Sequence, residues 1–180
     1  MKTLAIIILT ISFISNAQIK KIESLTLDSL IWKKVNVYRV SKGVTPFIAF
    51  EDSLMRDFCT RVAHRNIEKA IPLHSDSVGY WSNAECLYLY KYSGDNFNTL
   101  ANQLLSGNFE ALAERAVHAW IHSPTHEKAI SRPEYNIATV VSIIVIDYTN
   151  KTVRFESTYH ALDKEHNTFN DYIYHTKKGK

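Results

Sequence analysis

The chain has 180 residues, a length that suits one domain with a single packed core. Its 21 basic and 18 acidic residues nearly balance, which argues against a nucleic-acid-binding protein. No segment after residue 17 is apolar enough to cross a membrane. A single packed domain without a membrane span in the mature chain is therefore the expected class.

The first 17 residues have the pattern of a secretory signal peptide. Lys2 precedes the apolar run "LAIIILTISFI", and "SNA" supplies small residues directly before Gln18. A membrane anchor retained at the N-terminus is the alternative interpretation. If the peptide is removed, we expect a secreted or periplasmic protein with one domain over residues 18–165 and a polar, basic tail over residues 166–180.

Apolar residues recur at helical spacing in the first half of the chain and predict two helices. The first covers residues 26–41, and Asn36 and Arg39 lie off its apolar stripe. The second covers residues 52–69, with Cys59 on its apolar face. The apolar stripe of the first helix is Leu27, Leu30, Ile31, Val35 and Tyr38.

Turn residues and aromatic residues follow each other in the middle of the chain. "LHSDSVG" is typical of a turn, whereas the aromatic "ECLYLY" fits either a short helix or a strand. Two further helices are predicted over residues 97–105 and 109–120, the second capped by Asn108. Ser123 and Pro124 suit the cap and the first position of another short helix.

The pattern changes to that of strands after Pro133. "NIATVVSIIVIDY" is rich in β-branched residues, "KTVRFESTYH" alternates, and "TNK" forms a turn between them. These segments predict a β-hairpin. Helices followed by a hairpin indicate an α+β domain in which helices pack on an antiparallel sheet.

Cys59 and Cys86 are the two cysteines of the chain. Export to an oxidising compartment would permit a disulfide between them. Cysteine is also a common core residue, so two buried free thiols are the other interpretation. The sequence leaves both open, because it says nothing about the geometry that a disulfide requires.

His118 and His122 are four residues apart, which places them on one face of a helix. This spacing is half of a zinc-protease motif, but Ala119 occupies the position at which that motif carries its catalytic Glu. Both histidines fall opposite the apolar stripe, on the same side as Glu114. We therefore expect two solvent-facing histidines, with Glu114 and His118 as a weak surface pair.

Three other ionisable residues are better candidates for a site: His74, Glu85 and His126. His126 would lie in the first turn of the helix that begins at Pro124, where the helix dipole disfavours the imidazolium form. A neutral imidazole suits a metal ligand or a general base, although a polar loop histidine is the plain alternative. Glu85 is the only acid in an aromatic segment, so it either turns to water or is held by partners. His74 lies in a turn, and the three act together only if the fold brings them together.

The motifs of the chain together resemble those of the CAP superfamily, the cysteine-rich secretory, antigen 5 and pathogenesis-related proteins with an SCP-like domain. The bacterial members are the most similar. "NVYR" matches the family's Asn-x-x-Arg, "LHS" its His-Ser turn, and "NAECL" stands where Gly-Glu-Asn-Leu is usual. "AVHAWIHSPTHEKAI" resembles the bacterial Ala-Val-x-x-Trp-x-x-Ser-Pro-x-His segment. The resemblance extends from about Leu25 to Tyr159.

This resemblance implies a three-layer α-β-α sandwich with a central, largely antiparallel sheet, and a cleft with two histidines and two acids. Carried over to this chain, the histidines are His74 and His126, and the first acid is Glu85. Ser123 stands at the position of the second acid, which leaves a four-residue catalytic scheme incomplete. The eukaryotic disulfide framework is absent from this sequence.

Three functions follow from these expectations. The leading one is a secreted or periplasmic binding module whose His74 and His126, with Glu85, hold a divalent metal, and Zn²⁺ suits this ligand set. A small or lipid ligand is the other occupant of the cleft, and the resemblance implies lipid, sterol, envelope or host components as partners. A hydrolase, with His126 as base or with a metal-activated water, is the alternative, although no convincing nucleophile is present. A structural secreted domain with a vestigial cleft is the third.

Overall fold

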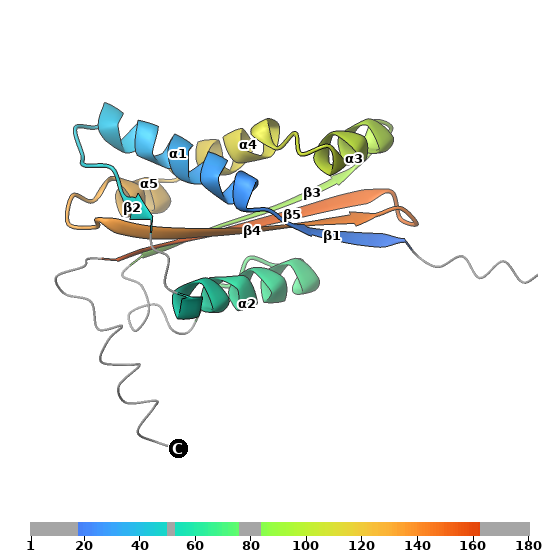
Figure 1. Ribbon diagram of the computed structural model, residues 1–180, viewed down its shortest axis with the longest axis horizontal. Coiled ribbons are helices and arrows are strands. Elements are labelled where there is room, and N and C mark those ends of the chain that lie inside the picture. The colour runs from blue at the N-terminus through green and yellow to red at the C-terminus, as the bar shows by residue number, and fades with distance from the viewer. Residues whose placement is uncertain (1–17, 50–52, 76–83, 163–180) are drawn as a thin grey trace, which may run out of the picture.

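The computed structural model describes residues 18–49, 53–75 and 84–162, which form an α+β domain of three layers (Figure 1). A sheet forms the middle layer, and helices cover both of its faces. This arrangement confirms the predicted α-β-α sandwich. No helix in these ranges combines the length and apolarity needed to cross a membrane. The expected signal peptide (1–17) and basic tail (166–180) lie outside the described residues.

Five helices and five strands are described. The helices are α1 (Leu25–Ser41), α2 (Ser53–Lys69), α3 (Phe97–Leu105), α4 (Glu110–Ile121) and α5 (Pro124–Ser131). The strands are β1 (Ile19–Glu23), β2 (Ile48–Ala49), β3 (Ala84–Ser93), β4 (Ile137–Asp147) and β5 (Thr152–Leu162). The aromatic middle segment, which fitted a helix or a strand, is therefore the strand β3. α2 covers one face of the sheet, here called the α2 face, and the other helices cover the opposite α1 face (Figure 1).

The predicted hairpin of β4 and β5 forms the centre of the sheet. The strand order is β1-β4-β5-β3, with antiparallel neighbours, and β2 adds a short parallel pair to β4. β3 is thus an edge strand that pairs only with β5 along this order. The sequence patterns do not predict β1 or β2. β2 has two residues, and β1 is a short, mostly exposed strand whose lysines interrupt any apolar pattern.

One of the two predicted helix caps agrees with the structure and one does not, and a third cap was not predicted. Ser24 caps α1, because its side chain accepts a hydrogen bond of 3.3 Å from the Leu27 N–H. Pro124 begins α5 with Ser123 at the cap position, although the Ser123 side chain makes no capping bond to a described residue. The expectation that Asn108 caps α4 is wrong, since Phe109 occupies that position.

Alternate strand residues divide the core between the two faces of the sheet. On the α1 face, Phe155 and Tyr159 of β5 pack with Trp120 of α4 in the larger apolar cluster. On the α2 face, Val141 and Val145 of β4 belong to a second cluster with the apolar side of α2. The sheet therefore separates two independent apolar cores.

Asn36 and Arg39 lie off the apolar stripe of α1, yet both are buried. Asn36 exchanges two hydrogen bonds with the backbone of Phe47, which accepts at 3.2 Å and donates at 2.7 Å. Polar residues of α1 thus anchor the loops that lead into β2 and β4, which is the physical content of the Asn-x-x-Arg motif here. The Arg39 guanidinium donates to the carbonyl groups of Thr45, Ile130, Arg132 and Tyr135.

Cys59 and Cys86 are both buried free thiols. Cys59 belongs to the core on the α2 face and Cys86 to the core on the α1 face, so the sheet lies between them. A disulfide between them is therefore wrong, and the alternative of two buried thiols is confirmed. Burial raises the pKa of both thiols well above the usual range, so neither is a reactive thiolate.

Candidate functional site

His74 and Glu85 meet where the edge strand β3 begins. His74 lies in the loop that follows α2, and Glu85 is the second residue of β3, on the α2 face beside Leu87. The Glu85 side chain is 1 % exposed, whereas the His74 side chain is 59 % exposed. The buried carboxylate of Glu85 therefore contacts an imidazole, that of His74, which is exposed to solvent.

Two residues near the end of α2 hold the loop that carries His74. The Asn66 side-chain oxygen accepts a hydrogen bond of 3.3 Å from the Leu73 N–H, and Asn66 is fully buried. Arg65 donates to the carbonyl groups of Leu73 and His74. Because both contacts come from one helix, they fix the backbone of His74 relative to the sheet.

The contact between His74 and Glu85 is short. The distance from His74 Nδ1 to Glu85 Oε2 is 2.6 Å, and the Ser75 N–H donates to the same oxygen at 3.1 Å. A carboxylate can only accept hydrogen bonds, so Nδ1 of His74 carries the proton. In the neutral form of the ring the lone pair is then on Nε2, which is the atom that a metal ligand or a base would use.

His126 lies in the first turn of α5 and is half-buried. Its carbonyl oxygen is 3.9 Å from Sγ of Cys86, the residue next to Glu85. Burial lowers the pKa of His126, and the charge of nearby His74 lowers it further. The neutral imidazole was predicted from the helix dipole, whereas the main cause found is burial. The structure thus pairs His74 with Glu85 on the α2 face, and it places the backbone of His126 on the α1 side of β3, where its ring still feels the charge of His74.

His160 of β5 is a further member of the site that the sequence did not indicate. It lies opposite Glu85 in the β3–β5 register, and its Nε2 is 3.4 Å from Glu85 Oε1. The side chain is fully buried and packs edge-on against the Phe58 ring. Burial lowers the pKa of His160 to about 3, so its imidazole is neutral at physiological pH.

Glu156 also lies on β5. At alternate positions of this strand, Glu156, Thr158 and His160 form a buried polar row on the α2 face. Asn66 and Thr158 each donate to its Oε1 at 3.2 Å, whereas Oε2 is buried without a hydrogen-bond partner among the described residues. Burial raises the pKa of Glu156 to about 8, and the charge of Glu85 contributes to the increase. The α2 face of β5 is therefore a buried polar row leading to Glu85.

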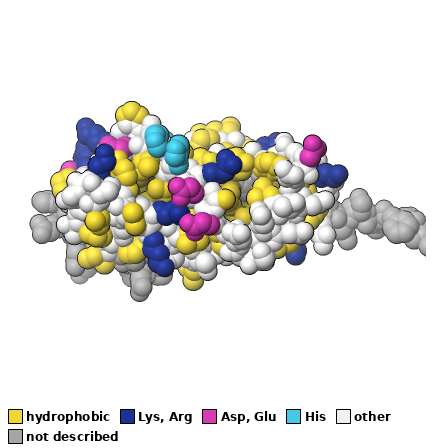
Figure 2. Space-filling view, turned by 90° about the horizontal axis from the view of Figure 1, so that it is seen from above, with side chains coloured by type: hydrophobic (Ala, Val, Ile, Leu, Met, Phe, Trp, Pro, Cys, Tyr) yellow, Lys and Arg dark blue, Asp and Glu magenta, His cyan; other side chains and the backbone are white. Residues whose placement is uncertain are grey.

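His118 and His122 lie on the exposed side of α4, as predicted. Their rings stack with centroids 4.0 Å apart, and histidine side chains are visible at the surface of the α1 face (Figure 2). The expected ion pair between Glu114 and His118 is not the main contact of Glu114. That carboxylate bonds instead to Lys34 of α1 at 2.7 Å, which lowers the pKa of Glu114.

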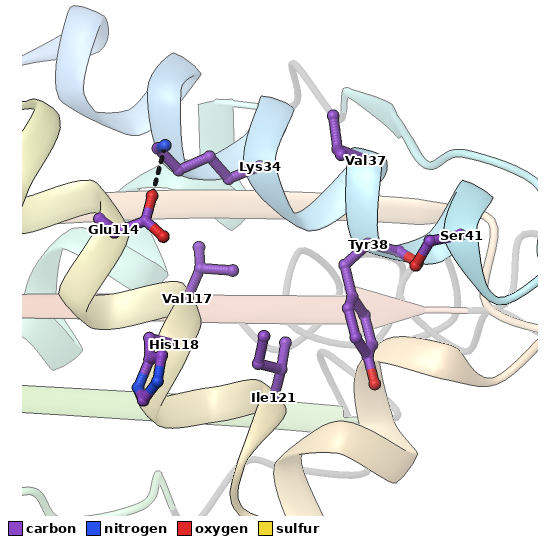
Figure 3. Close-up of a pocket in the computed structure, with 8 residues that line it drawn as sticks. All are labelled: Lys34, Val37, Tyr38, Ser41, Glu114, Val117, His118 and Ile121. Carbon is purple, nitrogen blue, oxygen red and sulfur yellow. Dashed lines mark hydrogen bonds and ion pairs between the residues drawn. The ribbon is translucent and has the colours of Figure 1, made fainter.

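A groove of about 390 Å³ runs between α1 and α4 (Figure 3). Its floor is apolar, and the Lys34–Glu114 ion pair lies at its edge. None of His74, Glu85 or His126 lines it, so it is separate from the histidine and glutamate cluster. Its lining residues are Lys34, Val37, Tyr38, Ser41, Glu114, Val117, His118 and Ile121.

The donor set of the cluster limits how it holds a metal. In the ranges that the structure describes, no three His, Cys, Asp or Glu side chains are arranged around a common metal position. Glu85 already accepts bonds from His74 and Ser75, so it orients His74 and is not a free ligand. Of the three predicted residues, His74 and His126 are therefore the two whose imidazoles are left as candidate ligands.

The fold and the cluster define a three-layer α+β domain with a histidine–carboxylate site at the edge of its sheet. No protein family model matches the chain, and no curated protein matches it in sequence. Membership of the CAP superfamily stays a prediction that rests on the motifs described above.

Proposed function

We propose that the protein is an exported binding module of the CAP type, with His74 and His126 as ligands for a divalent cation, Zn²⁺ being the best suited. The contact of 2.6 Å between His74 Nδ1 and Glu85 Oε2 carries this proposal. A metal-binding histidine typically donates its second ring N–H to a carboxylate, which fixes the tautomer and the ring orientation. Glu85 supplies that carboxylate from the interior, while His74 faces the surface.

The state of His126 supports the same proposal. Its lowered pKa keeps the imidazole neutral near physiological pH, so no proton has to leave before a metal binds. With two protein ligands, the cation would keep positions open for a small or lipid ligand. Lipid, sterol, envelope or host components are the partners that the CAP resemblance implies, and export follows from the predicted signal peptide.

A zinc titration by calorimetry tests the proposal, on the chain from Gln18 onward. Because exposed histidines four residues apart can themselves chelate a metal weakly, the reference protein carries His118→Ala and His122→Ala. We expect one zinc ion to bind to this reference, and His74→Ala or His126→Ala to abolish the binding. Glu85→Gln should weaken binding roughly 10- to 100-fold, as loss of an orienting partner does.

Two results would reject this assignment. Absence of zinc binding to the reference would remove the metal and leave the vestigial, structural domain as the better interpretation. Binding that survives both His74→Ala and His126→Ala would place the metal elsewhere.

A hydrolase is the second candidate, favoured by the pairing of His74 with a buried carboxylate. A base oriented by an acid is part of the Ser-His-Asp type of catalytic triad. Ser75 follows His74 directly, and its hydroxyl is buried without a partner among the described residues, so it is not presented to a substrate. Ester or amide hydrolysis that is lost with both His74→Ala and Glu85→Gln in a substrate screen would support this candidate.

A further inference from the structure

His160 faces Glu85 from the neighbouring strand, in the interior of the domain. β5 lies between β3 and β4, and the register places His160 opposite Glu85 on one side and Thr139 on the other. Phe58 of α2 packs against the ring from below, with centroids 5.5 Å apart. Strands on both sides and this one helix hold the imidazole in one place.

We propose that His160 is a positioning residue of the site, whose Nε2–H directs the Glu85 carboxylate toward His74. The nearest carboxylate atom to Nε2 is Glu85 Oε1, at 3.4 Å, a charge–dipole contact and not an aligned hydrogen bond. A ring nitrogen with a lone pair would repel a carboxylate oxygen at this distance, so the tautomer with the proton on Nε2 is favoured. The neutral ring then presents a donor without adding a second buried charge.

The donors around Glu85 show what His160 contributes. Oε2 accepts from His74 and from the Ser75 N–H, both of which belong to the loop after α2. His160 is the side chain that meets the other oxygen from within the sheet. The Ser75 N–H also reaches Oε1, at 3.4 Å, so His160 adds an electrostatic contact from the sheet side, and its removal would leave the loop after α2 as the source of the donors that orient Glu85.

This inference rests on the proposed function for its effect on metal binding, but the state of the metal-free site tests it separately. Two variants form a matched pair. His160→Gln carries its amide nitrogen about as far from Cβ as Nε2 of histidine, so it can still donate to Glu85. His160→Asn is also a small polar amide, but its nitrogen lies about where Nδ1 was, too short to reach Oε1.

The first readout is the tautomer of His74 in the metal-free chain, from the ¹⁵N shifts of its ring nitrogens. We expect the Nδ1–H form to dominate in the parent and in His160→Gln, and to fall to a mixture of tautomers in His160→Asn. The second readout is zinc affinity in the His118→Ala and His122→Ala reference. His160→Asn should weaken binding roughly 10-fold or more, and His160→Gln by less than about 3-fold.

Thermal unfolding of each variant separates positioning from mere stability. Equal loss of stability in both variants with the His74 tautomer unchanged in both would overturn the proposal. So would identical tautomer changes in His160→Gln and His160→Asn. If the parent binds no zinc, the metal proposal fails while the tautomer comparison still decides the role of His160. In a Glu85→Gln background, His160→Asn should have no further effect on the tautomer, as expected of residues that act through one contact.

Discussion

Each face of the sheet buries an ionisable side chain, Arg39 on the α1 face and Glu156 on the α2 face, and the two differ in how fully they are hydrogen-bonded. On the α1 face, Arg39 is fully buried, and its guanidinium donates to four backbone carbonyl groups. On the α2 face, Glu156 is also fully buried, but one of its oxygens has no partner among the described residues. The buried cation on the α1 face thus has a full set of acceptors, whereas the buried acid on the α2 face lacks a donor for one oxygen among the described residues.

The difference separates a structural polar group from one that costs stability. A fully partnered buried cation fixes loops in place, and its removal leaves several acceptors bare. A half-partnered buried acid costs free energy whenever it is ionised, and the protein avoids that cost by keeping it protonated. Such a cost is tolerated most often near functional sites, and Glu156 lies on the row that leads to Glu85.

Replacement of the satisfied charge should have the largest effect. Arg39→Met keeps most of the apolar volume but leaves four carbonyl groups without their donor. We expect the free energy of unfolding to fall by about 3–5 kcal/mol in denaturant titrations at pH 7. The loop before β2 and the segment from the end of α5 to β4 should lose amide-exchange protection first, because the four carbonyl groups belong to them.

Arg39→Lys is the control for charge. A single ammonium cannot reach acceptors in both loops, so we expect an intermediate loss of stability. A loss below about 1 kcal/mol in Arg39→Met would show that the carbonyl groups find other donors, and the contrast between the faces would then be unfounded.

Glu156→Gln should act in the opposite direction, by removing a cost. The pKa of Glu156 rises from 4.5 in the unfolded chain to about 8 in the folded protein. Stability from this group is therefore complete below pH 4.5 and is lost as the pH rises toward 8. We expect the wild-type chain to lose stability with rising pH in this range, and Glu156→Gln to lose far less.

His160 limits the pH range in which the loss of stability caused by Glu156 can be observed. Its pKa falls from 6.5 in the unfolded chain to about 3, so its contribution is complete above pH 6.5 and is lost on acidification. Below pH 6.5 the two groups oppose each other, whereas between pH 6.5 and 8 Glu156 acts without that opposition. Over this interval the wild-type chain should lose about 2 kcal/mol, at about 1.4 kcal/mol per pH unit. Equal pH profiles for wild type and Glu156→Gln would contradict the assignment.

The helices and the hairpin could be predicted from the sequence, whereas the burial of polar side chains on the α2 face could not. Each main helix carries its own apolar stripe, and the hairpin has a clear β-branched pattern, so these elements could be predicted locally. The alternation of Arg154, Glu156 and Thr158 with apolar residues is typical of a strand with one face in water. That face is instead covered by α2, and burial of this kind depends on a helix almost a hundred residues earlier in the chain.

The same reason explains the mixed outcome at the site. His74, Glu85 and His126 were predicted from a turn, an isolated acid and a helix start, together with the CAP resemblance, and the structure pairs His74 with Glu85, whereas a site shared with His126 stays a prediction. His160 has no local signal, because its role exists only through the β3–β5 register and the packing of Phe58. Arg39 was named as part of the Asn-x-x-Arg motif, but its burial was not predicted, since the carbonyl groups of Ile130, Arg132 and Tyr135 that it contacts are distant in sequence.

The smallest expected effect concerns the cysteines, one on each face. Cys59 of α2 and Cys86 of β3 have the sheet between them, so oxidation cannot join them without unfolding. We expect a reducing agent to change the midpoint of thermal unfolding by less than 1 °C, whereas loss of a native disulfide typically costs 2–5 kcal/mol.

A thiol reagent should label both cysteines only after unfolding, and Cys59→Ala and Cys86→Ala, each retaining one cysteine, assign the labelling rates. An intact mass two hydrogens lower, or rapid labelling of either thiol in the folded chain, would mean that the sheet does not separate two closed cores. Slow labelling of both would instead show that each face is sealed on its own, and that the opening to solvent at Glu85 is confined to the edge where His74 lies.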